Sequence, residues 1–186
     1  MKRPLGRLVA AAVVLAATLA LAGCSGTLRY PGTETFTLAQ GYDGKRPADV
    51  CVLAVSGSVS SEAGAALREG LRARLLELRY APVRLDEVDR KPGDYRPGGK
   101  NAVLEINVTK WDDASLYGDG TLRVSGDVRL FGGGSLDVLY HGKLEDVPVQ
   151  ASFVARTTES RPTTLNQAAA EAALRFLHGL PVKGDG

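Results

Sequence analysis

Alternation of apolar and polar side chains in the second half of the chain constrains the fold more than any other feature. Residues 121–131 alternate with a period of two, and the alternation returns in residues 136–144 after the glycines at 132–134. Residues 104–108 show the same period. Alternation on both sides of a glycine-rich turn is typical of antiparallel strands with one buried face. The sequence therefore predicts an antiparallel meander.

The segment before the meander predicts a strand, a helix and a second strand. Residues 50–55 form a continuous apolar run, typical of a central strand. Ser60 or Ser61 can cap the helix that follows. Its buried stripe is formed by four leucines spaced three or four residues apart: Leu67, Leu71, Leu75 and Leu78. Residues 83–85 can form the second strand, and residues 86–100 are expected to form a polar loop.

The C-terminal part predicts an edge strand and a helix. Residues 147–154 are expected at an edge of the sheet because Pro148 has no backbone N–H to donate to a neighbouring strand. Thr164 and Gln167 fit a capping box, and Gly179 stands where a helix commonly ends. The predicted fold is α+β: a mixed sheet with a β-α-β start, followed by an antiparallel meander and a C-terminal helix.

The first 23 residues have the pattern of a signal peptide. Positive charge at Lys2, Arg3 and Arg7 precedes the uncharged apolar run 8–22. That run is shorter than the roughly 20 residues that a membrane-spanning helix needs. It ends in Leu-Ala-Gly-Cys, which resembles the lipobox of bacterial lipoproteins and makes Cys24 the expected site of lipid attachment, palmitate included. Ser25, which follows, favours the outer membrane over inner-membrane retention.

These patterns divide the chain into four parts. Residues 1–23 are the predicted signal peptide, and residues 24–47 the lipidated N-terminus and a flexible tether, with one short strand near 35–38. Residues 48–180 are expected to form a single α+β domain, which is followed by a tail at 181–186. Of the 23 basic residues three lie in the signal, which leaves 20 basic against 21 acidic residues, a charge of −1. A domain of that charge has no electrostatic case for binding nucleic acid.

The mature sequence lacks the residue patterns of a catalytic, metal or cofactor site. His141 and His178 are the only histidines, and no paired spacing joins them to cysteine. His141 falls in the polar register of a strand, and His178 in the last turn of a helix. Residues 113–118 are better explained as a hairpin turn than as a calcium loop. Cys51 lies in a buried-strand pattern without a disulfide partner. We therefore expect no enzyme.

Trp111 is the residue that the sequence singles out for binding a partner. Strict alternation places it on one strand face with Glu105, Asn107 and Thr109, opposite the apolar face. An exposed tryptophan there would be a candidate hot spot. The alternative is that a helix or the tether covers that end of the sheet.

Several segments together resemble small envelope lipoproteins. The lipobox, the tether, the strand Ala-Asp-Val-Cys-Val-Leu-Ala-Val (48–55), the leucine-striped helix and the strand Asn-Ala-Val-Leu-Glu-Ile-Asn-Val-Thr-Lys-Trp (101–111) are similar to the group of CsgG, LpoB and the TolB N-terminal region, including a meningococcal surface-lipoprotein family. Two features depart from that group: the first strand ends in Val-Ser-Gly instead of a proline-rich segment, and the loop at 90–100 replaces a short helix.

The resemblance implies a non-catalytic protein that docks other envelope components. We therefore expect an outer-membrane lipoprotein whose periplasmic domain binds envelope proteins in assembly, export or wall maintenance. The alternative is a lipoprotein of lipid or lipopolysaccharide transport or assembly, which would take a lipid or glycolipid ligand. Its basis is a weaker resemblance of Gly-Thr-Leu-Arg (26–29) to the lipoprotein of the lipopolysaccharide-insertion complex.

Overall fold

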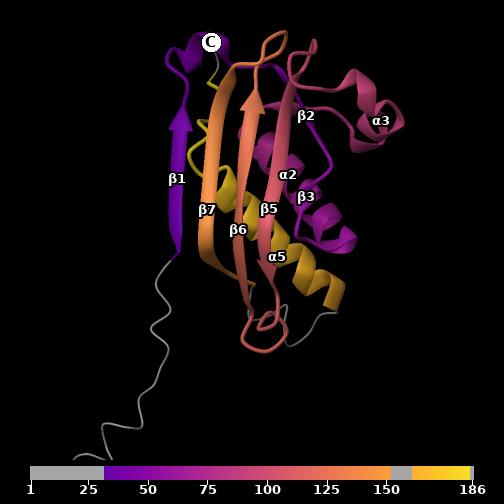
Figure 1. Ribbon diagram of the computed structural model, residues 1–186, viewed down its shortest axis with the longest axis vertical. Helices are drawn as coiled ribbons and strands as arrows, with labels where there is room; N and C mark the ends of the chain where they lie inside the picture. Colours follow the sequence, from indigo (N-terminus) through magenta and orange to yellow (C-terminus); the bar gives the residue numbers. More distant parts are fainter. Residues whose placement is uncertain (1–31, 152–160, 185–186) are drawn as a thin grey trace, which may run out of the picture. The chain divides into compact units, whose positions relative to one another are not determined.

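The computed structural model describes residues 32–151 and 161–184, and these form one mixed sheet with helices packed against it (Figure 1). Within them, six of the seven strands follow the order β1-β7-β6-β5-β2-β4, and the seventh, β3, pairs with β5 beyond the end of β2. The α+β class predicted from the sequence is confirmed.

The elements are β1 (Thr33–Leu38), η1 (Tyr42–Lys45), β2 (Asp49–Val52), β3 (Ser56–Gly57), α2 (Ser61–Glu77), β4 (Ala81–Pro82), α3 (Leu85–Arg90), η2 (Pro92–Asp94), β5 (Ala102–Asp112), β6 (Thr121–Phe131), β7 (Val138–Gln150) and α5 (Arg161–Phe176).

Strand direction divides the sheet into two parts. The strand β2 runs parallel to both β4 and β5, as a β-α-β connection through α2 requires. From β5 onward every pairing is antiparallel: β5 with β6, β6 with β7, and β7 with β1. The predicted meander is therefore present, and β1 extends it by a fourth strand.

Helices α2 and α5 cover one face of this sheet and bury the main core against it (Figure 1). The cap of α2 is the predicted one, since the Ser60 hydroxyl accepts a hydrogen bond from the Ala63 amide at 3.2 Å. The leucine stripe of α2 is buried, as its spacing predicted. Gly70 lets the two helices approach closely, because a Cβ there would lie 3.1 Å from the carbonyl oxygen of Ala169.

The C-terminal end of α5 lies directly on β7. The Tyr140 hydroxyl donates to the carbonyl oxygen of Phe176 at 2.6 Å, and both residues are fully buried. Gly142 makes room for this contact, since a Cβ there would lie 2.6 Å from that same oxygen. The helix begins earlier than the predicted cap: Arg161 and Pro162 belong to it, and Thr164 is buried within it. Proline is favoured in a first helical turn, so Pro162 does not end the helix.

A short helix, α3, covers one corner of the other face. Its Val88 packs with Cys51 of β2 and Val103 of β5 in a small second core. Arg68 of α2 holds α3 in place, because its guanidinium donates to the Asp89 carboxylate at 2.7 Å. The predicted strand at 83–85 and the polar loop at 86–100 are thus wrong: β4 is confined to Ala81–Pro82, and α3 begins at Leu85. The apolar residues there pack against the sheet instead of extending it.

The folded domain begins before the predicted boundary at residue 48. The strand β1 pairs with β7 over six residues, and the following turn is fixed by the buried hydroxyls of Tyr42 and Tyr80, 2.6 Å apart. Residues 33–47 of the predicted tether therefore belong to the folded domain. The first part of the tether and the signal peptide lie outside the described residues. Residues 147–150 of the predicted edge strand at 147–154 are the end of β7 itself, and residues 152–154 lie outside the described residues. Beyond Glu145, β7 has no register partner in β1, so Pro148 occupies a locally free edge.

No helix within the described residues is long and apolar enough to cross a membrane.

Candidate functional site

The face of the sheet opposite α2 and α5 carries two rows of polar side chains across four strands. The register aligns Glu105 of β5 with Arg129 of β6, His141 of β7 and Thr37 of β1 in the first row. It aligns Asn107, Asp127, Lys143 and Thr35 in the second row. All eight side chains are exposed or half-buried, in contrast to the buried residues that alternate with them. We call this surface the open face.

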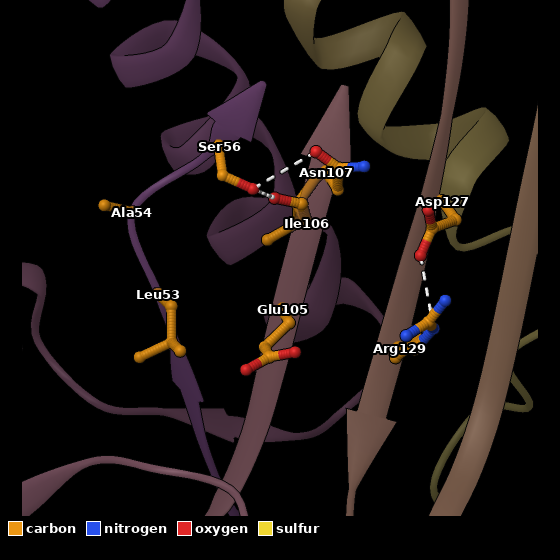
Figure 2. Close-up of a pocket in the computed structure, with 8 residues that line it drawn as sticks. All are labelled: Leu53, Ala54, Ser56, Glu105, Ile106, Asn107, Asp127 and Arg129. Atoms are coloured by element: carbon orange, nitrogen blue, oxygen red, sulfur yellow. Dashed lines mark hydrogen bonds and ion pairs between the residues drawn. The ribbon is translucent and has the colours of Figure 1, made fainter. Parts of the chain in front are cut away.

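The first row borders a hollow of about 320 Å³ next to the crossing from β2 to β3 (Figure 2). Leu53 and Ala54 form one wall, and Glu105, Asn107, Asp127 and Arg129 contribute polar groups (Figure 2). The Asp127 carboxylate forms an ion pair with the Arg129 guanidinium, with an N···O distance of 3.2 Å. This hollow therefore offers acceptors and donors side by side, with an apolar wall.

A second hollow, of about 410 Å³, lies on the other side of Arg129. His141 and Thr37 line it together with the exposed apolar side chains of Leu38 and Val138. Arg129 borders both hollows, so a ligand or partner that fills either one contacts this residue. Arg129 is therefore at the centre of the open face.

His141 has an unfulfilled hydrogen-bonding atom at this position. Its Nε2 is buried and has no hydrogen-bond partner within the described residues. The nearest acid is Asp127, whose carboxylate oxygen is 4.0 Å away, too far for a hydrogen bond. Buried polar atoms are seldom left unpaired. The open face thus contains a buried imidazole nitrogen that makes no hydrogen bond to the described residues.

Two β-bulges shape the end of this face where β1 begins. Both lie beside Ser125 of β6: one inserts Thr109 into β5, and the other inserts a residue at Asp146 in β7. Asp146 has a positive φ of 52°, and its amide donates to the Ser125 hydroxyl at 2.8 Å. Gly126 is required opposite the first bulge, because a Cβ there would lie 2.5 Å from the carbonyl oxygen of Asn107.

Asp146 lies between two basic side chains next to the second bulge. The nearly buried Arg123 guanidinium donates to its carboxylate at 3.0 Å, and the Lys110 ammonium donates at 2.9 Å. Hydrogen bonds from Arg123 and then Lys110 hold the pKa of the Asp146 carboxyl well below its usual range. Because all three groups satisfy one another next to a bulge, we assign them a structural role.

The structure corrects the predicted position of Trp111. The bulge at Thr109 shifts the alternation by one residue, so Trp111 pairs with the buried Val124 and packs against the main core. It lies on the helix-covered side and not, as strict alternation predicted, with Glu105 and Asn107. Its Nε1 is buried without a hydrogen-bond partner in the described part of the chain. Its proposed role in binding a partner stays a prediction.

The other residues singled out from the sequence lie apart from the open face, except for His141. Cys24, the predicted lipidation site, lies outside the described residues. Cys51 is fully buried, and burial raises its thiol pKa to about 11. His178 follows the end of α5 instead of lying in its last turn, with its Nδ1 3.8 Å from the Glu34 carboxylate.

The segment at 113–118 forms a turn within the β5–β6 connection, where the Asp112 carboxylate accepts from the Ala114 amide at 3.3 Å. Within the residues that the structure describes, no group of three or more histidine, cysteine or acidic side chains could hold a metal ion.

The open-face rows were missed from the sequence, although the alternating strands contained a signal for them. Each of Glu105, Asp127, Arg129 and Lys143 falls on the polar register of its strand. Their alignment across strands depends on the turn between β6 and β7 and on a register shift between Leu130 and Phe131 beside that turn. A register counted from Phe131 and Val138 without this shift would place Arg129 opposite Tyr140 instead of His141.

No protein-family model matches the chain, and no curated protein matches it in sequence. Solved structures with a similar arrangement include the PelC dodecamer from Paraburkholderia phytofirmans, at 14% identity over 78% of this chain and 96% of that chain, with a TM-score of 0.47. Lipoprotein GNA1162 from Neisseria meningitidis shares 17% identity over 72% of this chain and 99% of that chain, with a TM-score of 0.42. Protein CT253 from Chlamydia trachomatis shares 12% identity over 71% and 92%, with a TM-score of 0.43.

One of these structures is a meningococcal lipoprotein, the kind of protein that the sequence resembles. At such identities and TM-scores the likenesses concern shape alone, and no ligand or partner is inferred from them.

Proposed function

We propose that this chain is an outer-membrane lipoprotein whose domain binds other envelope proteins through the open face of its sheet. The observation that carries the proposal is the pair of polar rows left uncovered next to two hollows that meet at Arg129. The predicted signal peptide and Cys24 supply the location, and the periplasm is where a domain so anchored would meet its partners.

The chemistry of the open face supports recognition of a protein surface. Charges of both signs alternate along the rows, from Glu105 to Arg129 and from Asp127 to Lys143. Such patterns give an interface specificity and a fast association rate. Arginine is enriched among the residues that dominate binding energy, and Arg129 stands between the two hollows.

The proposal includes no catalysis. Next to His141, the register places Arg129 and Thr37. The Thr37 hydroxyl donates to the His141 carbonyl oxygen at 3.4 Å, which leaves it poorly placed to act as a nucleophile. Nucleophilic catalysis by a hydroxyl needs a base within hydrogen-bond reach of that hydroxyl.

Variant-dependent capture from detergent extracts of envelopes tests the docking role. Arg129→Ala removes the central guanidinium, and Arg72→Ala is the matched control on α2, beneath the opposite face. We expect the unaltered chain and the control to retain the same envelope protein. Loss of a hot-spot arginine costs about 2 kcal/mol, so Arg129→Ala should weaken that retention about 30-fold. Equal retention by all three chains would contradict docking through the open face.

A lipid or lipopolysaccharide carrier is the second candidate function, and a groove between α2 and α5 favours it. The groove has a volume of about 650 Å³ and is lined largely by small apolar residues, including Ala65, Gly70 and Ala170. That volume falls in the range of ligand-binding pockets. A carrier would copurify with lipid that mass spectrometry detects, whereas a docking protein would release none in stoichiometric amount.

A further inference from the structure

The two edges of the sheet differ in how they are protected against pairing with another strand. At one edge, β4 has only two residues, and one of them is Pro82. At the other edge, β1 has six residues in unbroken register with β7 and contains no proline or bulge. Short strands, prolines and bulges are the devices by which proteins keep sheet edges from pairing. The strand β1 lacks all three.

The single charge of β1 does not protect the edge either. Glu34 points to the helix side, where its carboxylate accepts from Arg175 at 3.3 Å. On the open face β1 presents Thr33, Thr35 and Thr37, which are exposed and uncharged. Threonine is among the residues that strands favour. The edge is therefore compatible with a neighbouring strand on chemical grounds.

The ladder with β7 shows which backbone groups face outward. The Ala39 amide donates to the Leu139 carbonyl at 2.9 Å, and this pairing continues at every second residue, through Thr37 and Thr35. The alternate residues, Glu34, Phe36 and Leu38, consequently direct their N–H and C=O groups away from the sheet. None of the backbone hydrogen bonds found in the described residues outside the strand ladders ends on these groups.

We propose that two copies of this chain pair antiparallel through β1 and join their sheets across a twofold axis at Phe36. In this register Glu34 faces Leu38 of the second copy, and Phe36 faces its own equivalent. Three outward N–H groups from each copy then find a carbonyl on the other. On the open face Thr35 faces Thr37 of the second copy, a favourable cross-strand pair.

The occupant is a second copy because β1 is complementary to itself. The antiparallel register brings no like charges together, since Glu34 meets a leucine, and the facing side chains of the open face are identical. A six-residue ladder is small for a stable interface. The predicted lipid at Cys24 would hold copies in one membrane and raise their effective concentration. The inference does not rest on the proposed docking function, although Thr35 and Thr37 belong both to the open face and to its edge.

Disulfide trapping tests the pairing on the full chain in lipid vesicles. Thr35→Cys and Thr37→Cys are prepared separately with different tags and then oxidised alone or mixed. Facing residues of such a pair have Cα atoms about 4.5 Å apart, whereas Thr35 and its own equivalent would be too distant to bridge. We expect the mixture to form at least tenfold more linked dimer than either variant alone. Lys143→Cys, on the adjacent strand, is the control that should not link.

Three outcomes would overturn the proposal: no dimer, equal linking in all combinations, or linking of these cysteines to a different protein. A second experiment with charged residues at positions 35 and 37 distinguishes loss of pairing from unfolding of the variants. The double change Thr35→Lys with Thr37→Lys places lysines opposite lysines and should abolish the dimer. Mixing it with the variant that carries glutamate at both positions should restore a mixed dimer. If the mixture remains monomeric while both variants are folded, the assigned register is wrong.

Discussion

Replacing Asp146 by asparagine should destabilise the domain by removing one charge from the cluster at the bulges. Asparagine tolerates the positive φ of 52° and keeps a side-chain oxygen, so the change isolates the negative charge. The Asp146 carboxylate accepts from Arg123 at 3.0 Å and from Lys110 at 2.9 Å. Hydrogen bonds to charged groups contribute about 1.5–3 kcal/mol each when buried.

Solvent exposure of Asp146 and Arg123 reduces the contribution of their hydrogen bonds to stability. The Asp146 side chain is 48% exposed and the Arg123 side chain 10%, so water screens the carboxylate more than the guanidinium. We expect Asp146→Asn to lower the free energy of unfolding by about 2 kcal/mol at pH 7. With a urea m-value of about 2 kcal/mol per molar, the unfolding midpoint should fall by about 1 M.

The lowered pKa of the Asp146 carboxyl makes the loss of stability in Asp146→Asn depend on pH. Its pKa is lowered in the folded state, so it stabilises the fold above the unfolded value of about 3.9 and ceases to do so as pH falls through the folded value. The stability gap between the unaltered chain and Asp146→Asn should therefore shrink below about pH 4. Asp112→Asn, which also lies near Lys110 at 3.9 Å, should change stability by less than about 0.5 kcal/mol. A gap that is absent at pH 7, or constant down to pH 3, would refute the reasoning.

Three further outcomes follow from the packing. Trp111→Ala should lower stability by about 2 kcal/mol in urea unfolding, because Trp111 packs on the core. Cys51, with its pKa raised to about 11, should resist a thiol reagent at pH 8 in a Cys24→Ser chain until urea unfolds it. Gly142→Ala should cost about 2–3 kcal/mol in thermal or urea unfolding, since its Cβ would lie 2.6 Å from the Phe176 carbonyl oxygen. Native-like stability of that variant would show that α5 can move away from β7.

Strong periodicity predicted much of the fold. The alternation in residues 121–131 corresponds to β6 over the same residues, and the leucine stripe lies on α2 with Ser60 as its cap. These segments were predictable because one buried face and a local hydrogen bond determine each of them. Their structure depends little on the rest of the chain.

The errors arose where tertiary contacts outweigh local pattern. Leu85 and Val88 looked like the end of a strand and part of a polar loop, yet α3 buries Val88 against Cys51. The short strand predicted near 35–38 is present as β1, but it was assigned to a flexible tether, whereas pairing with β7 makes it an edge strand of the domain. Which strand it pairs with depends on a contact distant in sequence, and the segment itself does not indicate that contact.

The candidate site was predicted only in part for a related reason. A single inserted residue, Thr109, moved Trp111 from the expected polar face to the core, and no local signal in β5 marks a bulge. His141 was placed correctly on the polar register. Its neighbours Arg129 and Asp127 become a site only through cross-strand register, which a single strand cannot reveal.

Photo-crosslinking in intact cells tests docking through the open face most directly. A photoreactive residue replaces Lys143 on the open face in one chain and Glu69, beside the groove of α2 and α5, in another. We predict a discrete protein adduct from position 143 that position 69 does not give. Protein adducts of equal yield from both positions would contradict docking through the open face. Lipid adducts from position 69, with no protein adduct from position 143, would instead favour the carrier function.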